Sequence, residues 1–423
     1  MLEITRIRTS KDDLVKGLKK RGVDFSEKLN EVIRLDEEWR SKKTERESIQ
    51  SESNKLSKSI GQLFKQGKSD EANEAKEKST ALKSSEQTLK EEVTALEDKI
   101  QTLLYDIPNV PQDVVPNGVT EEDNEITEEY GEAPSFDFTP KPHWDLAKEL
   151  ETIDFELGVK VTGAGFPFYT GKGAKLQRGL INFFLDEADK AGYKEVIPPL
   201  VVNEASGIGT GQLPDKEGQM YHATEDDLYL IPTSEVPLTN IYRDTIVKDD
   251  NFSIKMTAYT PCFRREAGSY GSDVRGLNRL HQFDKVELVR VEHPERSEQA
   301  LVEMVDHVKG LLEKLELQYR VLRLCGGDLG FTSSITYDFE VYSAAQDKWL
   351  EVSSVSLFDT FQANRLKLRY RDENKKTQLC HTLNGSALAL PRIVAALMEN
   401  HQNKDGSISL PKAIQSYVGM DKI

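Results

Sequence analysis

Two long stretches near the N-terminus carry apolar residues at helical spacing. They run from about Ser26 to Phe64 and from Ser69 to Tyr105, and no proline occurs before Pro108. The second has apolar residues at heptad spacing, namely Leu82, Leu89, Val93, Leu96, Ile100 and Leu103, and the first has a shorter seam of Ile49, Leu56, Ile60, Leu63 and Phe64. Gly61 and Gly67 bracket a break between them. This pattern predicts an antiparallel coiled-coil hairpin.

From Lys141 onward the pattern changes to mixed helices and strands. Helices are expected at Ala174–Ala191, Pro294–Leu317 and, last in the chain, near Pro391–Asn400; strands are expected at EVIPPLVV (residues 195–202), Tyr337–Tyr342 and Trp349–Phe358. Because strands and helices do not alternate regularly, we expect an α+β fold, with an antiparallel sheet flanked by helices. Gly207–Gly211 is expected to be a flexible loop.

Composition divides the chain into three parts. Residues 1–107 form the helical arm, residues 108–140 an acidic linker, and residues 141–423 the α+β domain. The linker assignment depends on a run from Gln101 to Pro140 that contains several prolines and acids but no Lys or Arg.

The charge balance restricts the classes of partner. The net charge of −16 argues against a general nucleic-acid binder. Between Asn54 and Lys68, however, there are four lysines and no acid: Lys55, Lys58, Lys65 and Lys68. A basic tip on an acidic chain favours contact with a phosphate backbone. The alternative is a hairpin that only dimerises or spaces.

Membrane and metal chemistry find little support in the sequence. No apolar run approaches the roughly 20 residues of a membrane span, and the N-terminus lacks the apolar core of a secretory signal. Cys262, Cys325 and Cys380 form no CxxC pair, so we expect reduced thiols in a cytoplasmic protein, without zinc.

The segment TPCFRREAGSYGSDVRGLNRLHQFDKVEL (residues 260–288) predicts an antiparallel hairpin with unusual side chains. Arg264 and Glu266 are two residues apart, and Arg279, Phe283 and Glu287 share parity, so each set is expected on one face of its strand. Two guanidinium groups, a flat ring and two carboxylates are suited to the phosphates and base of a nucleotide. The intervening residues 267–276 hold three glycines and are expected to form a mobile loop. A surface hairpin with paired charges is the alternative.

This segment resembles the second signature motif of class II aminoacyl-tRNA synthetases, and the string RGLNRLHQFDKVEL is most similar to the seryl-tRNA synthetase family. The resemblance implies that Arg264 bridges the α-phosphate of ATP and the carboxylate of serine. It implies that Glu266 reads adenine and that Phe283 stacks on it. The implied set of ATP-binding residues also includes Arg265, Arg279 and Arg392, with Arg264 and Arg392 as the catalytic pair; His281 is expected to be structural.

Residues Glu351, Val352, Ser353 and Ser354 form an EVSS string within a predicted strand. Its carboxylate and hydroxyl are oxygen ligands suited to Mg²⁺, and the resemblance implies that this string holds ATP and the metal. Glu351 and Ser354 are three apart, so a regular strand would point them oppositely, and a bulge or bend is required if both bind one ion. An ordinary half-exposed strand is the alternative.

The segment HTLNGSALALPRIVAALMEN (residues 381–400) resembles the third signature motif, in which an arginine, here Arg392, opens a helix and reaches the phosphates or the far face of the adenine. A tight strand-to-helix turn with a surface arginine is the alternative. Ala387 and Ala389 stand where the family often has glycine. The resemblance also implies a serine pocket that reads the ammonium and hydroxyl groups of the substrate. Its residues are Thr233, Ser234, Glu235, Arg264, Glu287, Asn384 and Ser386.

The implied activity is a two-step ligation of L-serine to tRNA(Ser), with tRNA(Sec) as a further candidate, by a homodimer that uses ATP and Mg²⁺. Only 31 residues follow Arg392, too few for a separate anticodon-binding domain, so the N-terminal arm is expected to select the tRNA. Two alternatives are a paralogue with another acceptor and a coiled-coil scaffold with an inactive nucleotide-binding domain.

Overall fold

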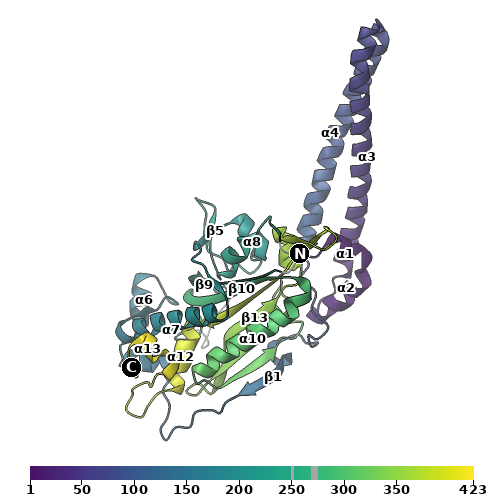
Figure 1. Cartoon of the computed structure of the whole chain (residues 1–423). Coiled ribbons are helices and arrows are strands. Elements are labelled where there is room, and N and C mark those ends of the chain that lie inside the picture. The colour runs from purple at the N-terminus through teal and green to yellow at the C-terminus, as the bar shows by residue number, and fades with distance from the viewer. Residues whose placement is uncertain (249–251, 268–274) are drawn as a thin grey trace. The chain divides into compact units, whose positions relative to one another are not determined.

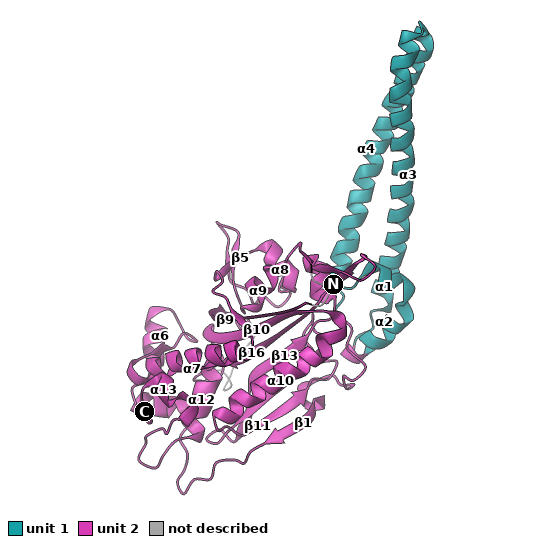
Figure 2. Ribbon diagram, viewed as in Figure 1, with its two compact units in different colours: residues 1–19, 23–108 teal, residues 20–22, 109–423 magenta. Residues whose placement is uncertain are grey.

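The computed structural model describes residues 1–248, 252–267 and 275–423. The central part of the loop predicted at 267–276 therefore lies outside the described residues. The chain divides into two compact units, one of residues 1–19 and 23–108, the other of residues 20–22 and 109–423 (Figure 2).

The first unit is helical (Figure 1). Its helices are α1 (Ile4–Thr9), α2 (Lys11–Leu18), α3 (Ser26–Lys65) and α4 (Ser69–Tyr105), and α3 and α4 pack as the predicted hairpin. Gly67 has a φ of 77° in the short turn, a conformation in which glycine has no steric cost. Gly61, predicted to mark the break, lies inside α3.

The seam between α3 and α4 is apolar over part of its length. The buried apolar residues of α4 are Ala72, Leu89, Val93, Leu96, Ile100 and Leu104. Towards the turn, Ser53 and Ser79 occupy buried positions, and the hydroxyls of Ser57 and Ser79 lie 3.2 Å apart. Phe64 was expected in the seam but is 49% exposed, because α3 ends one residue later.

The second unit is built on a large sheet, which has eight strands among the described residues. In spatial order they are β1 (Glu125–Tyr130), β11 (Tyr319–Arg323), β12 (Ile335–Ser343), β13 (Lys348–Leu357), β16 (His381–Ala389), β10 (Gln282–Glu292), β9 (Ser253–Phe263) and β4 (Lys194–Glu195). Neighbours are antiparallel except β4 and β9, which are parallel. This confirms the expected α+β class.

Short helices, turns of 3₁₀ helix and small sheets complete this unit. The helices are α5 (His143–Glu149), α6 (Phe155–Val161), α7 (Gly171–Lys190), α8 (Glu204–Thr210), α9 (Glu235–Asn240), α10 (Ser297–Lys314), α11 (Phe361–Leu366), α12 (Leu390–Asn400) and α13 (Lys412–Val418). The small sheets are β5 (Val201–Asn203) with β7 (Leu228–Leu230) and β6 (His222–Ala223), β2 (Ile153–Asp154) with β3 (Phe168–Tyr169), and β14 (Arg369–Arg371) with β15 (Thr377–Leu379) and β8 (Ile246–Val247). The 3₁₀ turns are η1 (Lys19–Arg21), η2 (Glu121–Asp123) and η4 (Pro294–Arg296).

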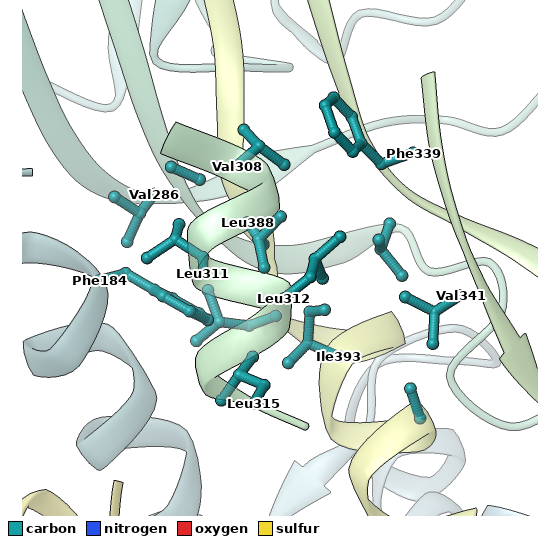
Figure 3. Close-up of a cluster of buried hydrophobic side chains, with 14 of the residues drawn as sticks. Phe184, Val286, Val308, Leu311, Leu312, Leu315, Phe339, Val341, Leu388 and Ile393 are labelled. Atoms are coloured by element: carbon teal, nitrogen blue, oxygen red, sulfur yellow. The ribbon is translucent and has the colours of Figure 1, made fainter. Parts of the chain in front are cut away.

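The main hydrophobic core lies between the sheet and three helices. Phe184 of α7, Leu312 of α10 and Ile393 of α12 meet Val286 of β10 and Phe339 of β12 there (Figure 3). Helix α7 was predicted at residues 174–191 and ends before Gly192, whose φ of 82° terminates it. The core therefore fixes one face of the sheet and leaves the other available for a site.

Several segments differ from expectation. The string EVIPPLVV divides at its two prolines into β4 and β5, which belong to different sheets, because proline lacks the N–H that a ladder requires. The predicted flexible loop at Gly207–Gly211 falls largely in helix α8, whose first turn is capped by the Asn203 side chain. A further helix, α13, follows the one expected to be last.

Part of the segment expected to be a linker belongs to the main sheet. Strand β1 pairs with β11 at the sheet edge. The acidic side chains of β1 find basic partners there, because Glu125 pairs with Arg323 and Glu128 with Lys309. Separately, no helix among the described residues is both long and apolar enough to cross a membrane.

Candidate active site

One cavity of about 510 Å³ collects most of the residues that the sequence singled out. This volume lies in the range of small-molecule sites. The cavity is lined by Gln212, Glu217, Gln219, Pro232, Thr233, Glu235, Arg264, Glu266, Leu277, Asn278, Arg279, Leu280, Phe283, Lys285, Glu287, Glu351, Val352, Ser353, Ser354, Asn384, Ser386, Ala389, Pro391 and Arg392.

The alternation of β10 explains how one strand serves both core and cavity. Val286 and Leu288 belong to the hydrophobic core, whereas Phe283, Lys285 and Glu287 line the cavity. Successive side chains of a strand point to opposite faces, so a single register places every odd residue from 283 to 287 towards the site. The core side therefore supports the site side rigidly.

The predicted parity of the motif residues needs correction. Strand β9 ends at Phe263 and β10 begins at Gln282, so Arg264, Glu266 and Arg279 lie beyond the strand ends. Glu266 has a φ of 48°, which is outside strand conformations. All three side chains still line the cavity, and Arg279 Nη1 lies 3.1 Å from Glu266 Oε2. Their positions just beyond the strand ends, and not strand parity, place the three side chains at the cavity.

Arg264 is held from several directions. Its backbone N–H donates to the His281 carbonyl at 2.9 Å, and its carbonyl accepts from His281 Nδ1 at 3.0 Å. The Arg264 guanidinium lies 5.2 Å from the centre of the Phe283 ring, and its Nε donates to the Pro232 carbonyl. These contacts give His281 the structural position expected of it and leave the Arg264 fork facing the cavity.

A buried cluster of charges forms another part of the cavity wall. Lys285 Nζ donates to Thr233 Oγ1 at 2.8 Å and pairs with the Glu287 carboxylate. Burial, and after it the Glu287 charge, raises the pKa of Glu235 to about 7, although Gln362 donates to its Oε1 at 2.6 Å. The cluster thus holds Glu235, whose pKa lies near neutrality, beside the carboxylate that pairs with Lys285.

The bulge required in the EVSS string is present. In the pairing of β12 with β13, Phe339 lies opposite Ser353 but Glu340 lies opposite Glu351, so Val352 is the extra residue. Both Glu351 and Ser354 consequently line the cavity.

Arg392 and the small residues of β16 close the site. Arg392 lies in the first turn of α12; its Nε donates to the Asn278 carbonyl at 3.2 Å, and its Nη1 lies 3.4 Å from Glu351 Oε2. Asn384 and Ser386 come from β16, where Ser386 is paired with Glu287. Third-motif and second-motif residues are therefore adjacent through the sheet register.

Two predicted site residues do not line the cavity. Ser234 is fully buried, and its hydroxyl lies 2.6 Å from that of Thr260. Arg265 bonds through its backbone N–H to the Gln219 carbonyl. Their neighbours in sequence face the cavity, and the chain direction turns these two away from it.

Sequence reasoning missed some residues of the site. Lys285 was passed over although its parity with Phe283 and Glu287 identifies it as a cavity residue. Asp338 lies opposite Ser354 in the β12–β13 ladder, and burial, followed by the Glu351 charge, raises its pKa well above the usual value. Asp338 itself does not line the cavity, and its place beside Ser354 follows only from the register of β12 with β13.

The four predicted tip lysines lie in the first unit. Lys55, Lys58 and Lys65 are exposed on α3, and Lys68 is exposed at the start of α4, where it pairs with Glu71 at 2.9 Å. Their lack of tertiary packing is compatible with a surface contact.

Comparison with known proteins agrees with this architecture. The family model described as the tRNA synthetase class II core domain (G, H, P, S and T) matches residues 219–401, and that of the seryl-tRNA synthetase N-terminal domain matches residues 1–111. The serine–tRNA ligase of Salinibacter ruber is 50% identical over 424 residues, covering 100% of this chain and 99% of the relative.

Solved structures agree as well. The seryl-tRNA synthetase of Pyrococcus horikoshii, solved with ATP, has a TM-score of 0.92 and 34% identity, covering 100% of this chain and 99% of that one. The cytoplasmic serine–tRNA ligase of Naegleria fowleri, solved with AMP, has a TM-score of 0.87 and 25% identity, with coverages of 99% and 98%.

The antiparallel sheet and the arginine- and carboxylate-lined cavity on it are thus those of a class II aminoacyl-tRNA synthetase. The full-length similarity to serine–tRNA ligases and the match of the N-terminal domain narrow this class to one family. The chain belongs to the seryl-tRNA synthetase family.

Proposed function

We propose that this chain ligates L-serine to tRNA in two steps. In the first, a carboxylate oxygen of serine attacks the α-phosphorus of ATP, the bond to the bridging oxygen breaks, and pyrophosphate leaves. In the second, a ribose hydroxyl at the 3′ end of tRNA attacks the seryl carbonyl, and AMP leaves. The observation that carries this proposal is a single cavity that joins an arginine- and phenylalanine-lined region to a buried carboxylate–lysine–threonine cluster.

The arginine-lined region is assigned to ATP. Arg264 neutralises the α-phosphate and the attacking carboxylate, and Arg279 and Arg392 bind the remaining phosphate oxygens. Phe283 stacks on the adenine and Glu266 accepts from its amino group. Catalysis then consists of positioning and charge neutralisation, with no protein nucleophile. The ATP bound in the Pyrococcus relative supports this assignment.

Mg²⁺ is proposed at Glu351 and Ser354. The bulge at Val352 lets both oxygen ligands face one cavity, which fits a hard divalent cation. Among the described residues no group of three or more His, Cys, Asp or Glu side chains has metal-binding geometry, so further ligands would come from the triphosphate. The ion would supply charge neutralisation at the phosphates.

The buried cluster is assigned to serine. Glu235 and Glu287 accept from the substrate ammonium, while Thr233, Asn384 and Ser386 read its hydroxyl. Bound alanine would leave these buried polar groups without water and without a hydrogen-bond partner. This cost disfavours alanine relative to serine. Lys285 compensates one carboxylate, so the cluster is not left with two uncompensated negative charges before substrate binds.

The remaining assignments concern the arm and assembly. We assign residues 1–107 to binding tRNA(Ser) through the tip lysines, with tRNA(Sec) as a further candidate, and residues 141–423 to catalysis. Residues 108–140 are assigned to the connection, with β1 of this segment built into the main sheet. A homodimer is favoured by the exposed apolar residues Ile197, Leu200 and Val201, of which Ile197 is 89% exposed. We place the activity in the cytoplasm, where its substrates occur.

Amino-acid-dependent exchange of pyrophosphate into ATP, measured without tRNA, tests the assignment. We expect exchange with serine and none above background with alanine, glycine or threonine. Exchange driven by a different amino acid would refute the serine pocket. No exchange with any amino acid would favour the scaffold alternative.

A further inference from the structure

Residues 275–280 form one wall of the cavity, and the start of α5 holds this wall from behind. Leu277, Asn278, Arg279 and Leu280 line the cavity. The backbone N–H of Leu277 donates to Nε2 of His143 at 2.9 Å, and His143 is fully buried. A cavity wall that carries Arg279 is thereby attached to a side chain that does not itself line the cavity.

The other ring nitrogen of His143 fixes its tautomer. Nδ1 lies 2.7 Å from Glu399 Oε1. Because Nε2 accepts from an N–H, it carries no proton, and Nδ1 must donate to the carboxylate. Burial raises the pKa of Glu399, but hydrogen bonds from the His143 side chain and backbone and from Ser343 outweigh burial and leave the pKa below its usual value. An ionised Glu399 thus keeps Nε2 available as an acceptor.

Two further contacts shape the same wall. The Arg275 guanidinium lies 4.6 Å from the centre of the Trp144 ring. Gly276 has a φ of 68°, and a Cβ there would lie 2.2 Å from His143 Nε2. Any residue other than glycine is therefore excluded at position 276, where the chain passes His143.

Glu399 also connects the wall to the third-motif arginine. Gln346 Nε2 donates to Glu399 Oε1 at 3.0 Å, and Gln346 Oε1 accepts from Asn278 Nδ2 at 3.2 Å. The Asn278 carbonyl in turn accepts from Arg392 Nε at 3.2 Å. Arg392 and Glu399 are seven residues apart on α12, so they lie on the same side of that helix.

We propose that His143 and Glu399 are positioning residues for ATP: they set the wall at 275–280 and thereby Arg279 and Arg392. They touch no substrate and act only through the backbone of Leu277 and the Gln346–Asn278 bridge. The inference deepens the proposed function, since it takes the arginine-lined region to be the ATP subsite.

Two substitutions separate the two side-chain hydrogen bonds of His143, and both keep the bond from its backbone N–H to Glu399 Oε1. In His143→Gln, the amide reaches the place of Nε2, so its oxygen accepts from Leu277 while the side-chain bond to Glu399 is lost. In His143→Asn, the amide reaches the place of Nδ1, so it donates to Glu399 while the Leu277 N–H loses its acceptor. His401→Gln is the control, because His401 is a half-buried histidine directly after α12 whose Nε2 bonds to the Leu315 carbonyl and not to the cavity wall.

KM and kcat of serine-dependent pyrophosphate exchange are measured for ATP and for serine. We expect His143→Asn to raise KM for ATP roughly tenfold, with KM for serine unchanged, because the wall and its arginine move by a fraction of an ångström. His143→Gln is expected to stay within about threefold of wild type, as is His401→Gln. Equal values of KM for ATP in His143→Asn and His143→Gln, or a parallel rise in KM for serine, would overturn the proposal.

Trp144→Leu decides the question if the His143 variants do not fold, as judged by their thermal midpoints. It removes the partner of Arg275 from a half-buried position, and KM for ATP is expected to rise about threefold. An unchanged KM for ATP would then overturn the proposal. If the wild-type protein showed no serine-dependent exchange, the proposed function itself would be refuted. If the wild-type protein were active and the variants had an unchanged KM for ATP, only the positioning role would be refuted.

Discussion

The helical arm and the sheet domain use charged side chains in opposite ways. In the arm, pairs such as Lys78 with Glu52, whose Nζ and Oε1 lie 3.1 Å apart, are exposed, with side chains 61% and 50% accessible. In the sheet domain, Lys285 and Glu287 pair with side chains only 7% and 3% accessible. Exposed pairs contribute about 0–1 kcal/mol, whereas breaking a buried pair costs about 3–5 kcal/mol.

The two regions also differ in how they are stabilised. The arm has one seam, apolar from Leu89 to Leu104 and partly polar near the turn, where Ser53 and Ser79 are buried. The sheet domain has a core shared by strands and helices distant in sequence (Figure 3). The arm therefore presents a charged surface whose members are individually replaceable, and the cavity is a network in which each member depends on its neighbours.

The largest expected effect comes from removing the arm. Deletion of Asn30–Tyr105 should abolish tRNA charging and leave serine-dependent pyrophosphate exchange near the wild-type rate, because the cavity is contained in the second unit. The new ends are close in the intact protein, since Lys28 Nζ lies 3.4 Å from Asp106 Oδ2, and a short glycine linker joins them.

Charging and exchange are measured on the same preparation of the deletion variant. A quadruple alanine variant of Lys55, Lys58, Lys65 and Lys68 serves as the milder counterpart, since it keeps both helices. Charging that survives the deletion would mean that the arm is only structural, and the contrast between the two regions would lose its functional meaning.

The next largest effect is expected at Arg264. Arg264→Ala should lower kcat/KM of exchange by about 10²–10³, because a buried-site donor to a developing charge is lost. Arg265→Ala is the matched comparison, since Arg265 neighbours it in sequence but does not line the cavity, and a loss of only about threefold is expected. Equal losses in the two variants would show that lining the cavity does not determine which arginine is needed for exchange.

Local patterns predicted the arm and the identity of most cavity residues. The helices α3 and α4 match their predicted ranges within about one residue, since heptad spacing and a glycine turn are local signals. Arg264 and Phe283 were predicted because they lie in a short string with unusual chemistry, and Arg392 because its segment resembles the third signature motif of the class. Requiring Glu351 and Ser354 to share one site predicted a bulge or bend between them, and the structure has a bulge at Val352.

Features that depend on contacts distant in sequence were not predicted. Asp338 lies beside the cavity residue Ser354 only through the register of β12 with β13, and His143 meets the cavity wall only through the backbone of Leu277, 134 residues away. Strand β1 was expected to be linker because its acids found no basic partners nearby in sequence, whereas Arg323 supplies one across the sheet. Pairing in space, which composition does not encode, determined all three.

A pH effect of about tenfold is expected at Glu235, because its pKa near 7 lies above the reference value of 4.5. Below pH 7 the carboxyl in the empty cavity is protonated and does not attract the serine ammonium. At pH 6 about one site in ten is ionised, so KM for serine should be about tenfold higher than well above pH 7. Glu235→Gln should raise KM for serine and remove this pH dependence; a wild-type KM independent of pH would contradict the assignment.

The same group affects stability with the opposite sign. Since burial raises its folded pKa, the native state retains a proton that the unfolded state loses between pH 4.5 and 7. Its contribution to the free energy of unfolding is therefore fully present below pH 4.5 and is lost as pH rises through 7. Thermal midpoints of wild type and Glu235→Gln, compared at pH 5.5 and 8, separate this contribution from the effect on serine binding.

The smallest effect is expected from single lysines of the arm. Lys55→Ala should weaken tRNA binding only about threefold and reduce the slope of log K against log salt by about one, because each phosphate contact releases counterions independently. Lys90→Ala is the control, since Lys90 is also exposed but lies on α4 beside Glu91 and Glu92, outside the basic tip. If Lys90→Ala changed affinity and salt slope as much as Lys55→Ala, binding would depend on the overall charge of the arm and the tip would have no special role. If Lys55→Ala weakened tRNA binding by as large a factor as Arg264→Ala lowers exchange, the arm, like the cavity, would depend on single residues.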